Sequence, residues 1–494
     1  MYGRLALRHL TLRPGRTLLL LAGYGVGVAV MIVLLSIGEA LLAQARDEKL
    51  VGGGDITVLP EGIDVEVMKT GGLGGMFFSI DHARFVDLQL LSAPRLANDI
   101  RAVAPQIEGT LLYLRTPDGD ERPVRGFGEI PSATRAVGAS PSVLSGSWDD
   151  DDGDRRWARP TPAELLHDID HFHLPPTDLS AAARETWAEW HYFNILSSDR
   201  RRWAFVTLLV GGDVPAGRWG GRVLVTLREE GGTERRFVTV AAPAAVRFST
   251  TGADLDVGLS SVRVLPDGKY AVKAIAREVG GGSGTANVNL IVAPTPRAYF
   301  PGATLGGDVV SGYAVAALRA TGAGTICVDG ACDRYDGAQA YHDHNWGTWS
   351  GVTWEWGASR AGPFTLLYGR VETPGTEAGS LFLYLVDSLG FRALFRPARI
   401  EYEDARTIIV RGREVRVPAR AVMADARGAD TLRVELEIED AIGTDVRLSA
   451  ERGGRSASMP KPYFIQMKGR ARLSGRVGGE VLRGTGTGFF ETYR

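Results

Sequence analysis

The sequence has 494 residues, of which 44% are hydrophobic and 23% charged, and this ordinary globular composition excludes a largely disordered chain. Its 56 basic and 58 acidic residues leave a formal net charge of −2 and form no basic tract, so nothing indicates a nucleic-acid partner. The length allows about two to four domains, and the 63 glycines between short apolar segments favour a mainly β body.

The N-terminus predicts a membrane anchor. An uncharged apolar run extends from Thr17 to Ile37, and at about 1.5 Å per residue it can cross a hydrocarbon core of about 30 Å. The arginines before this run direct the N-terminus to the cytoplasm, which places the rest of a single-pass inner-membrane protein on the extracytoplasmic (periplasmic) side; they are Arg4, Arg8, Arg13 and Arg16. A cleaved signal peptide is the alternative, since "AQA" at 43–45 has the form of a cleavage site. The run nevertheless exceeds the roughly 7–15 apolar residues of a signal peptide, so we favour an anchor over residues 1–45.

Residues 46–140 predict a small α+β segment. Leu96, Ile100 and Val103 recur at helical spacing, and Pro117-Asp118-Gly119 marks a hairpin turn. The stretch "LALRHLTLRPGRTLLLLAGYGVGVAVMIVLLSIGEAL" followed by "GGGDITVLPEG" resembles the start of MacB/FtsX-type ABC transporter permeases. In that family one helix leads into an extracytoplasmic domain and further membrane helices follow. No second long apolar run follows Ile37 here, so the sequence departs from a complete permease.

Residues 141–180 predict a linker or connector. In "SGSWDDDDGD" a calcium loop is the alternative, but four adjacent aspartates cannot converge as the alternate ligands of an EF-hand do. The next stretch, "HDIDHFHLPP", predicts a connector rather than a metal site, because Pro175-Pro176 closes it. Its polar residues are His167, Asp168, Asp170, His171 and His173.

The remainder predicts two antiparallel β domains, at 181–346 and 347–494. Each contains about eight short segments of strand character, such as "RRWAFVTLLV" and "SLFLYLVDS", separated by turns. Two barrels and two sandwiches both fit this pattern. A closed barrel of about eight strands has room for one small ligand.

The two cysteines predict a disulfide. In "TICVDGAC" the pair Asp329-Gly330 is a strong two-residue hairpin turn, which sets Cys327 opposite Cys332. Opposed residues of a non-hydrogen-bonded pair approach to about 4.5 Å, which a disulfide can bridge. Such a bond fits an oxidising compartment outside the cytoplasmic membrane. Two reduced cysteines are the alternative.

The segment "AYHDHNWGTW" at 340–349 is the principal candidate for chemistry. As a strand it would carry two faces, one with His342, His344 and Trp346 and the other with Asp343 and Asn345 beside Tyr341. A metal site on the two histidines needs a third ligand, and the sequence shows no partner motif, so we expect no metal. Proton transfer by His344, oriented by Asp343 and Asn345, remains, with a purely structural role at a strand end as the alternative.

Neighbouring strands supply candidates for binding a large apolar ligand, with core packing as the alternative for each aromatic residue. They are Trp354 and Trp356 on one face with Glu355 on the other, Tyr368 and Arg370 on the next strand, and Glu189 and Tyr192 upstream.

Four motifs in order carry a second resemblance. "EWHYFN" at 189–194, "YHDHNWGTW" at 341–349, "GVTWEWG" at 351–357 and "GTGFFETYR" at 486–494 resemble the AttH and hydroxyneurosporene synthase (carotenoid hydratase) superfamily, over roughly residues 160–494. The resemblance implies two tandem lipocalin-like barrels and an apolar, isoprenoid or lipid ligand. In the enzymatic members it implies hydration or cyclisation of isoprenoid double bonds by proton transfer, without a cofactor.

The resemblance also implies roles for single residues. The histidine and tryptophan that border the reaction site in the hydratases correspond to His344 and Trp346. The Tyr-x-Asp pair that supplies their proton donor corresponds to Tyr368-Gly369-Arg370, so the acid is replaced by Arg370, which cannot donate a proton to an alkene.

The sequence thus predicts an anchored envelope protein with a small α+β segment and two lipocalin-like barrels that bind an apolar ligand. The leading function is a cofactor-independent hydratase, cyclase or isomerase, in which His344 transfers the proton with Asp343, Asn345 and Tyr368 in support. The alternative is a non-catalytic lipid-binding or carrier module, an accessory to an ABC-type exporter.

Overall fold

The computed structural model describes residues 14–47, 80–138, 149–280, 282–305, 311–349, 351–372, 379–446 and 461–494. The chain divides into two compact units, the leader unit (Met1–Phe78 with Asp99–Asp154) and the double-barrel unit (Ser79–Asn98 with Arg155–Arg494). The stretch "GGGDITVLPEG", on which part of the permease resemblance rests, lies outside the described residues.

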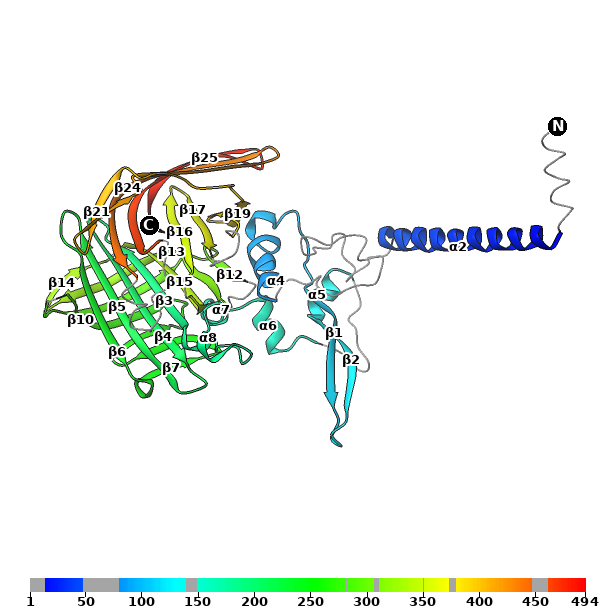
Figure 1. Ribbon diagram of the computed structural model, residues 1–494, viewed down its shortest axis with the longest axis horizontal. Coiled ribbons are helices and arrows are strands. Elements are labelled where there is room, and N and C mark those ends of the chain that lie inside the picture. The colour runs from blue at the N-terminus through cyan, green and yellow to red at the C-terminus, as the bar shows by residue number, and fades with distance from the viewer. Residues whose placement is uncertain are drawn as a thin grey trace. The chain divides into compact units, whose positions relative to one another are not determined.

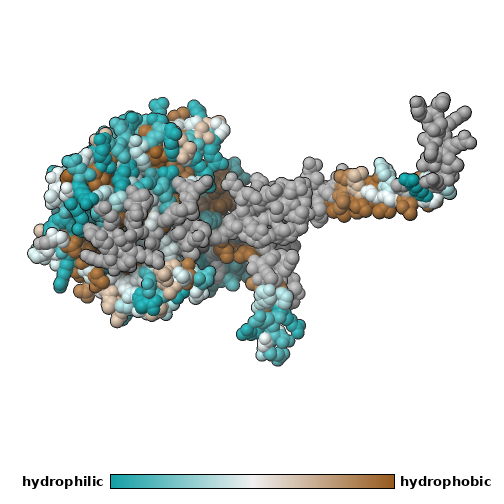
Figure 2. Space-filling view, in the orientation of Figure 1, coloured by the Kyte–Doolittle hydropathy of each residue, from teal (hydrophilic) through white to brown (hydrophobic). Residues whose placement is uncertain are grey.

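The leader unit contains one long helix and a β-hairpin. Helix α2 (Pro14–Asp47) holds the predicted apolar run, and its part Pro14–Ile37 is long and apolar enough to cross a membrane. Apolar side chains cover this helix in Figure 2. Strands β1 (Gln106–Arg115) and β2 (Glu121–Glu129) pair around the predicted turn, and helix α5 (Pro131–Ala136) follows.

Short helical elements accompany the strands of the double-barrel unit. They are α4 (Ile80–Val86), the π-helical turn η1 (Asp87–Leu91), the 3-10 turn η2 (Pro94–Leu96), α6 (Asp152–Ala158), α7 (Pro162–Ile169), α8 (Ala181–Glu185) and the 3-10 turn η3 (Pro243–Ala245). The helix predicted from the spacing of Leu96, Ile100 and Val103 is wrong, because only the turn η2 is helical there. Pro105 biases the residue before it towards an extended backbone, and β1 begins directly afterwards.

The first sheet closes into an antiparallel barrel, seen in Figure 1 as the mainly green body. Its strands follow the order β3-β4-β5-β6-β10-β11-β13-β15, and β15 pairs back with β3. They are β3 (Trp187–Leu196), β4 (Arg202–Asp213), β5 (Arg218–Glu229), β6 (Arg235–Ala241), β10 (Tyr270–Glu278), β11 (Thr285–Pro294), β13 (Ser311–Val328) and β15 (Ala338–Thr348). Strands β7 (Val246–Ser249), β8 (Gly252–Val257) and β9 (Ser260–Val264) extend from β10, and β12 (Phe300–Leu305) and β14 (Ala331–Arg334) pair with β13.

The second sheet has the order β19-β18-β17-β16-β26-β25-β24-β23-β20. Its strands are β16 (Thr353–Ala361), β17 (Phe364–Glu372), β18 (Phe382–Asp387), β19 (Gly390–Phe395), β20 (Glu401–Glu403), β23 (Arg420–Arg427), β24 (Asp430–Asp445), β25 (Tyr463–Val477) and β26 (Glu480–Tyr493). Strands β21 (Arg406–Val410) and β22 (Arg413–Val417) form a separate hairpin. The predicted mainly β fold class is confirmed.

Alternation of side chains along the strands builds several apolar layers among the described residues. One fills the closed barrel and includes Phe193 and Val288, and a second covers one face of the second sheet and includes Leu383. A third layer joins the two sheets through aromatic residues such as Tyr341 and Trp356. The interior of the first barrel is therefore separate from the space between the sheets.

The hairpin of β13 and β14 carries the disulfide. Asp329 and Gly330 both have positive φ, 51° and 86°, as a two-residue hairpin turn requires. Cys327 pairs with Cys332 across the ladder, and the two residues are bonded with Cα atoms 3.9 Å apart.

Candidate functional site

Strand β15 lies between β13 and β3, and its two faces look into different spaces. His342 and His344 point into the closed barrel, where both are fully buried. Asp343 and Asn345 point the other way and line a cleft between the two sheets. The alternation of the segment therefore divides the predicted site residues into two groups.

The cleft has a volume of about 1190 Å³, enough for a large organic ligand. Its aromatic lining comes from both sheets and includes Trp190, Tyr192, Trp349, Trp354, Trp356 and Phe464. The Trp349 indole nitrogen is buried and has no hydrogen-bond partner among the residues that the structure describes. It is a donor available to a bound molecule.

Asp343 is a buried carboxyl group on the wall of this cleft, with 4% of its surface exposed. Tyr341 donates its hydroxyl to Oδ2 at 2.6 Å, and the Asn345 amide donates to Oδ1 at 2.8 Å. Burial raises the pKa of Asp343 to about 8, helped by the nearby Glu491 charge and opposed by these two hydrogen bonds. The side chain is thus held in one orientation and holds a proton near neutral pH.

Glu491 is the second buried carboxyl group of the cleft and comes from β26. It accepts hydrogen bonds from the Tyr192 hydroxyl at 2.8 Å, the Trp354 indole at 2.9 Å and the Gln466 amide at 3.4 Å. Burial raises its pKa in spite of these three donors. A pair of carboxyl groups with different surroundings can act as acid and base.

Inside the barrel, His344 lies between two carboxylates. Its Nδ1 is 2.9 Å from Asp170 Oδ1, and its Nε2 is 2.8 Å from Glu189 Oε1. Burial alone would lower the pKa of His344, but these bonds outweigh it and raise the pKa to about 10. His173 also contacts Glu189, at 2.9 Å through Nδ1. His344 is therefore a charged, enclosed ring rather than a wall of the cleft.

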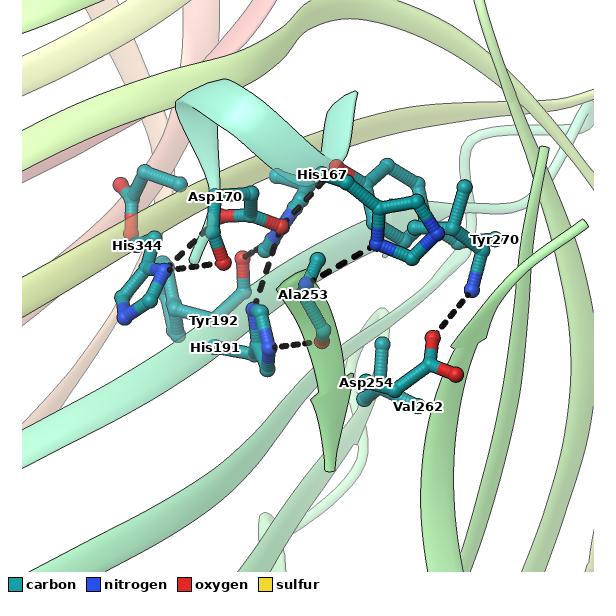
Figure 3. A network of polar contacts seen from close by, with 12 residues as sticks. His167, Asp170, His191, Tyr192, Ala253, Asp254, Val262, Tyr270 and His344 are labelled. Atoms are coloured by element: carbon teal, nitrogen blue, oxygen red, sulfur yellow. Dashed lines mark hydrogen bonds and ion pairs between the residues drawn. The ribbon is translucent and has the colours of Figure 1, made fainter. Parts of the chain in front are cut away.

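Asp170 is the centre of this buried cluster, and Figure 3 shows His191 and His344 directed at it. Its Oδ2 is 2.9 Å from His342 Nε2, 3.4 Å from His191 Nδ1 and 2.9 Å from the Tyr270 hydroxyl. Burial lowers the pKa of His191 to about 3, which leaves that ring neutral. Asp170, His191 and His342 are the described residues that lie close enough together to hold a metal ion.

Helix α7 positions Asp170. Thr161 and Glu164 form a capping box at its first turn, and Asp170 is its C-terminal cap. His167, in the last turn, accepts the Ala253 N–H at 3.1 Å through Nδ1, which ties the helix to β8. The segment that the sequence predicts as a connector thus delivers a buried carboxylate to the barrel.

The remaining predicted residues lie outside the cleft. Trp346 stacks on His173 with ring centroids 4.0 Å apart. Glu355 and Arg370 face each other across β16 and β17 and form an ion pair of 2.6 Å, on the opposite strand face from Trp354 and Trp356. The Tyr368 hydroxyl is buried without a partner among the described residues.

Sequence reasoning missed Asp170, His191 and Glu491 as site residues. Asp170 and His191 stand in the quoted stretches "HDIDHFHLPP" and "EWHYFN", and Glu491 is the one acid of "GTGFFETYR". A carboxylate inside an otherwise apolar strand is itself a signal, since acids are rarely buried without a purpose. This signal does not identify the residues that contact the carboxylate, because they lie far from it in the sequence.

Comparisons with solved structures bear on the fold. No protein-family model matches the sequence, and no curated protein does. A protein described as AttH from Nitrosomonas europaea matches with 15% identity and a TM-score of 0.45, over 65% of this chain and 98% of that one. Kievitone hydratase from Nectria haematococca matches with 13% identity and a TM-score of 0.39, over 66% and 98%. CghA, in a structure with Sch210972, matches with 13% identity and a TM-score of 0.40, over 66% and 97%.

The chain is thus similar to AttH and to kievitone hydratase, at low identity. These matches include AttH and a hydratase, the kinds of protein that the four sequence motifs resemble. The resemblance of the leader to MacB/FtsX-type permeases finds no support among these matches, which cover about two thirds of the chain.

Proposed function

We propose that this protein is a cofactor-independent acid–base enzyme that hydrates or cyclises an apolar, unsaturated substrate in the cleft between its two sheets. One observation carries the proposal: two buried carboxyl groups, Asp343 and Glu491, border one aromatic-lined cleft. The four motifs that resemble carotenoid hydratases agree with this chemistry.

The two carboxyl groups take different roles. Glu491 accepts three hydrogen bonds, which oppose the effect of burial on its pKa, and a carboxylate with a raised pKa is the better proton acceptor, so Glu491 is suited to be the base. Asp343 accepts two and is the proton donor. Since Tyr341 and Asn345 hold the Asp343 carboxyl in place, the proton reaches the substrate without a large reorientation.

Hydration then proceeds in balanced steps. The Asp343 proton bonds to one alkene carbon and leaves a cation on the other, and a water oxygen bonds to that carbon while its proton passes to Glu491. In a cyclisation, a second double bond attacks the cation instead, and Glu491 removes the proton of the resulting cation. Exchange with solvent returns both carboxyl groups to their starting states.

The aromatic wall stabilises the cationic intermediate. Indole faces attract a cation within about 6 Å, by roughly 0.5–2 kcal/mol each when water is excluded. Trp354 and Trp356 are fixed for this by their own bonds, to Glu491 at 2.9 Å and to the Tyr341 hydroxyl at 2.8 Å. The Trp349 N–H, which has no partner among the described residues, can bind the attacking water or a substrate oxygen.

The proton-transfer role passes from His344 to Asp343 in this proposal. His344 is fully buried on the other face of β15, and both of its ring nitrogens are engaged by carboxylates. Tyr368 and Arg370 likewise face away from the cleft, so the absence of an acid at position 370 does not argue against hydration.

We place the double-barrel unit outside the cytoplasmic membrane, tethered by α2. The apolar span and the arginines before it support an anchor, and the disulfide supports an oxidising compartment.

The test uses the purified full chain incubated with a total lipid extract in ¹⁸O-labelled water. Mass spectrometry should detect products that have gained labelled water, or cyclised isomers of unchanged mass. Asp343→Asn should lower the rate by about 10²- to 10⁴-fold, the usual contribution of a general acid. Glu491→Gln should act similarly, whereas Glu480→Gln, at an exposed position of the same strand β26, should leave the rate unchanged.

Two outcomes oppose the proposal. Full activity of Asp343→Asn would show that Asp343 is not the proton donor. Recovery of a bound apolar molecule that is never converted would favour the carrier function instead.

A further inference from the structure

Three acceptor atoms converge on one point inside the closed barrel, on the other side of β15 from the cleft. They are Asp170 Oδ2, His191 Nδ1 and His342 Nε2, and they lie within 4.8 Å of one another. The carboxylate oxygen is 2.9 Å from the His342 nitrogen and 3.4 Å from the His191 nitrogen. All three side chains are fully buried.

Backbone carbonyl groups determine where the ring protons lie. His191 Nε2 is 2.9 Å from the Ala253 carbonyl oxygen, and His342 Nδ1 is 3.1 Å from the Tyr192 carbonyl oxygen. A carbonyl oxygen only accepts, so each of these nitrogens carries the N–H of its ring. The opposite nitrogen of each neutral ring therefore presents a lone pair to Asp170, as in metal-binding histidines oriented by a carbonyl group.

A single proton does not satisfy this arrangement. A proton between His342 Nε2 and Asp170 Oδ2 would complete the hydrogen bond between these two residues. The Tyr270 hydroxyl already donates a second hydrogen bond to Asp170 Oδ2. His191 Nδ1 would still lack a partner, and it has no hydrogen bond among the residues that the structure describes. An unpartnered nitrogen in a closed interior has lost its bonds to water without gaining another, which is unfavourable.

We propose that Asp170, His191 and His342 bind a divalent first-row transition metal ion, with zinc as the representative case. Two imidazoles and one carboxylate form a ligand set that zinc uses, with bond lengths of about 2.0–2.1 Å. At the tetrahedral angle such bonds separate neighbouring ligand atoms by about 3.3–3.4 Å. The His191–Asp170 separation of 3.4 Å agrees with this, and the His342–Asp170 separation of 2.9 Å is shorter by about 0.4 Å. The ion joins the end of α7 to β3 and β15, and its enclosure makes it structural.

The aromatic surroundings support a closed structural site. Phe193 stacks on the His342 ring with centroids 4.1 Å apart, and Phe172 contacts the His191 ring edge-on at 5.0 Å. These rings exclude water and fix the imidazole planes. The inference does not depend on the proposed function, since the site and the cleft use opposite faces of β15.

The test measures metal content and spectra of the full chain in detergent. Elemental analysis after growth with added zinc should give close to one ion per chain. Growth with cobalt should give the visible absorption bands of a Co²⁺ ion with nitrogen and oxygen ligands. The wild-type protein should melt at a lower temperature after prolonged treatment with a strong chelator.

Variants separate this site from adventitious binding. His191→Gln should weaken zinc binding by more than about 100-fold, since loss of a supporting group alone costs about 10- to 100-fold. The matched control is His171→Gln, because His171 bonds to the Asp168 carbonyl oxygen and takes no part in the cluster. It should retain the ion.

Either of two results would overturn the proposal. One is wild-type protein that contains no zinc or cobalt and whose melting temperature is unchanged by the chelator. This measurement does not depend on the folding of any variant. The other is equal metal content in wild type, His191→Gln and His171→Gln.

Discussion

Asp343 and His344 are neighbours in the chain, and their surroundings give them opposite protonation behaviour. Asp343 faces an aromatic cleft that raises its pKa to about 8, so the carboxyl group is held neutral. His344 faces two carboxylates, which raise its pKa to about 10 and keep it charged. Functional sites are places where such perturbed groups gather. The protonation state of each residue therefore depends on the face of β15 on which its side chain lies.

Glu491 should make the fold less stable as the pH rises. Its pKa is raised in the folded state, so the folded chain binds more protons than the unfolded one above pH about 4.3, the unperturbed glutamate pKa. Stability therefore falls as pH increases through the folded pKa. Glu491→Gln should raise the melting temperature relative to wild type at pH 8 and by much less at pH 4. Equal shifts at both pH values would contradict a raised pKa.

Tyr368→Phe should leave the protein equally or more stable. The Tyr368 hydroxyl is buried without a partner among the described residues, so its removal relieves a desolvation cost of about 1–3 kcal/mol. Urea unfolding measures the change. Tyr341→Phe is the matched comparison and should destabilise the fold, because Asp343 loses one of its two hydrogen bonds and the Trp356 indole loses its bond to the hydroxyl. A loss of stability in Tyr368→Phe would show that its hydroxyl has a partner.

Glycines on the strands beside the site leave room for the tryptophan rings of the neighbouring strands. Trp356 on β16 lies opposite Gly369 on β17, and its ring covers that glycine. On β13, Gly312 makes the same space for Trp346. The strands therefore fix the aromatic walls by local pairing, while helix α7 fixes Asp170 through its caps.

Gly369→Ala should disturb the cleft. An added Cβ would overlap the Trp356 ring, and overpacking of this kind costs about 1–3 kcal/mol. We expect a lower melting temperature and a change in tryptophan fluorescence. Gly322→Ala on β13 is the control, since its Cβ would meet Ala338 at an ordinary 3.4 Å. Equal effects of the two substitutions would show that overlap with the Trp356 ring is not what destabilises Gly369→Ala.

At the scale of the whole molecule, the chain combines an apolar helix with a double-barrel unit that has its own cores. The segment Ser79–Asn98 precedes the leader hairpin in sequence but belongs to the double-barrel unit. There Arg95 pairs with Asp387 at 2.6 Å, and Phe85 packs against Tyr299 and Tyr384. The order of segments along the chain is therefore not their order in space.

The N-terminal helix should hold the protein in the membrane. After cell fractionation, the full chain should stay in the pellet through an alkaline carbonate wash, because a span of this length inserts essentially irreversibly. A chain that begins at residue 48 should be released. If expression of the full chain instead gives soluble protein whose N-terminus lies after Ala45, the helix is a cleaved signal peptide.

Much of the fold could be predicted because its signals are local. The apolar run of α2, the turn at Asp329-Gly330 and the Gly-separated strands each follow from a few adjacent residues. The helix expected near Leu96 failed because apolar spacing does not supply the tertiary packing on which a short helix depends. Of the site, the alternation of Asp343 and Asn345 against His342 and His344 could be predicted, and their partners could not.

The sequence by itself determined the mainly β body, the membrane-length helix, the facing cysteines and the two faces of β15, since each depends on composition or on a period of two residues. Only the tertiary structure decided which face sees the cleft. Barrel closure through the pairing of β15 with β3 encloses His342 and His344, and the second sheet brings Glu491 to Asp343. Asp170 reaches His342 across 172 positions of the chain, a contact that chain closure and packing create and that no local pattern encodes.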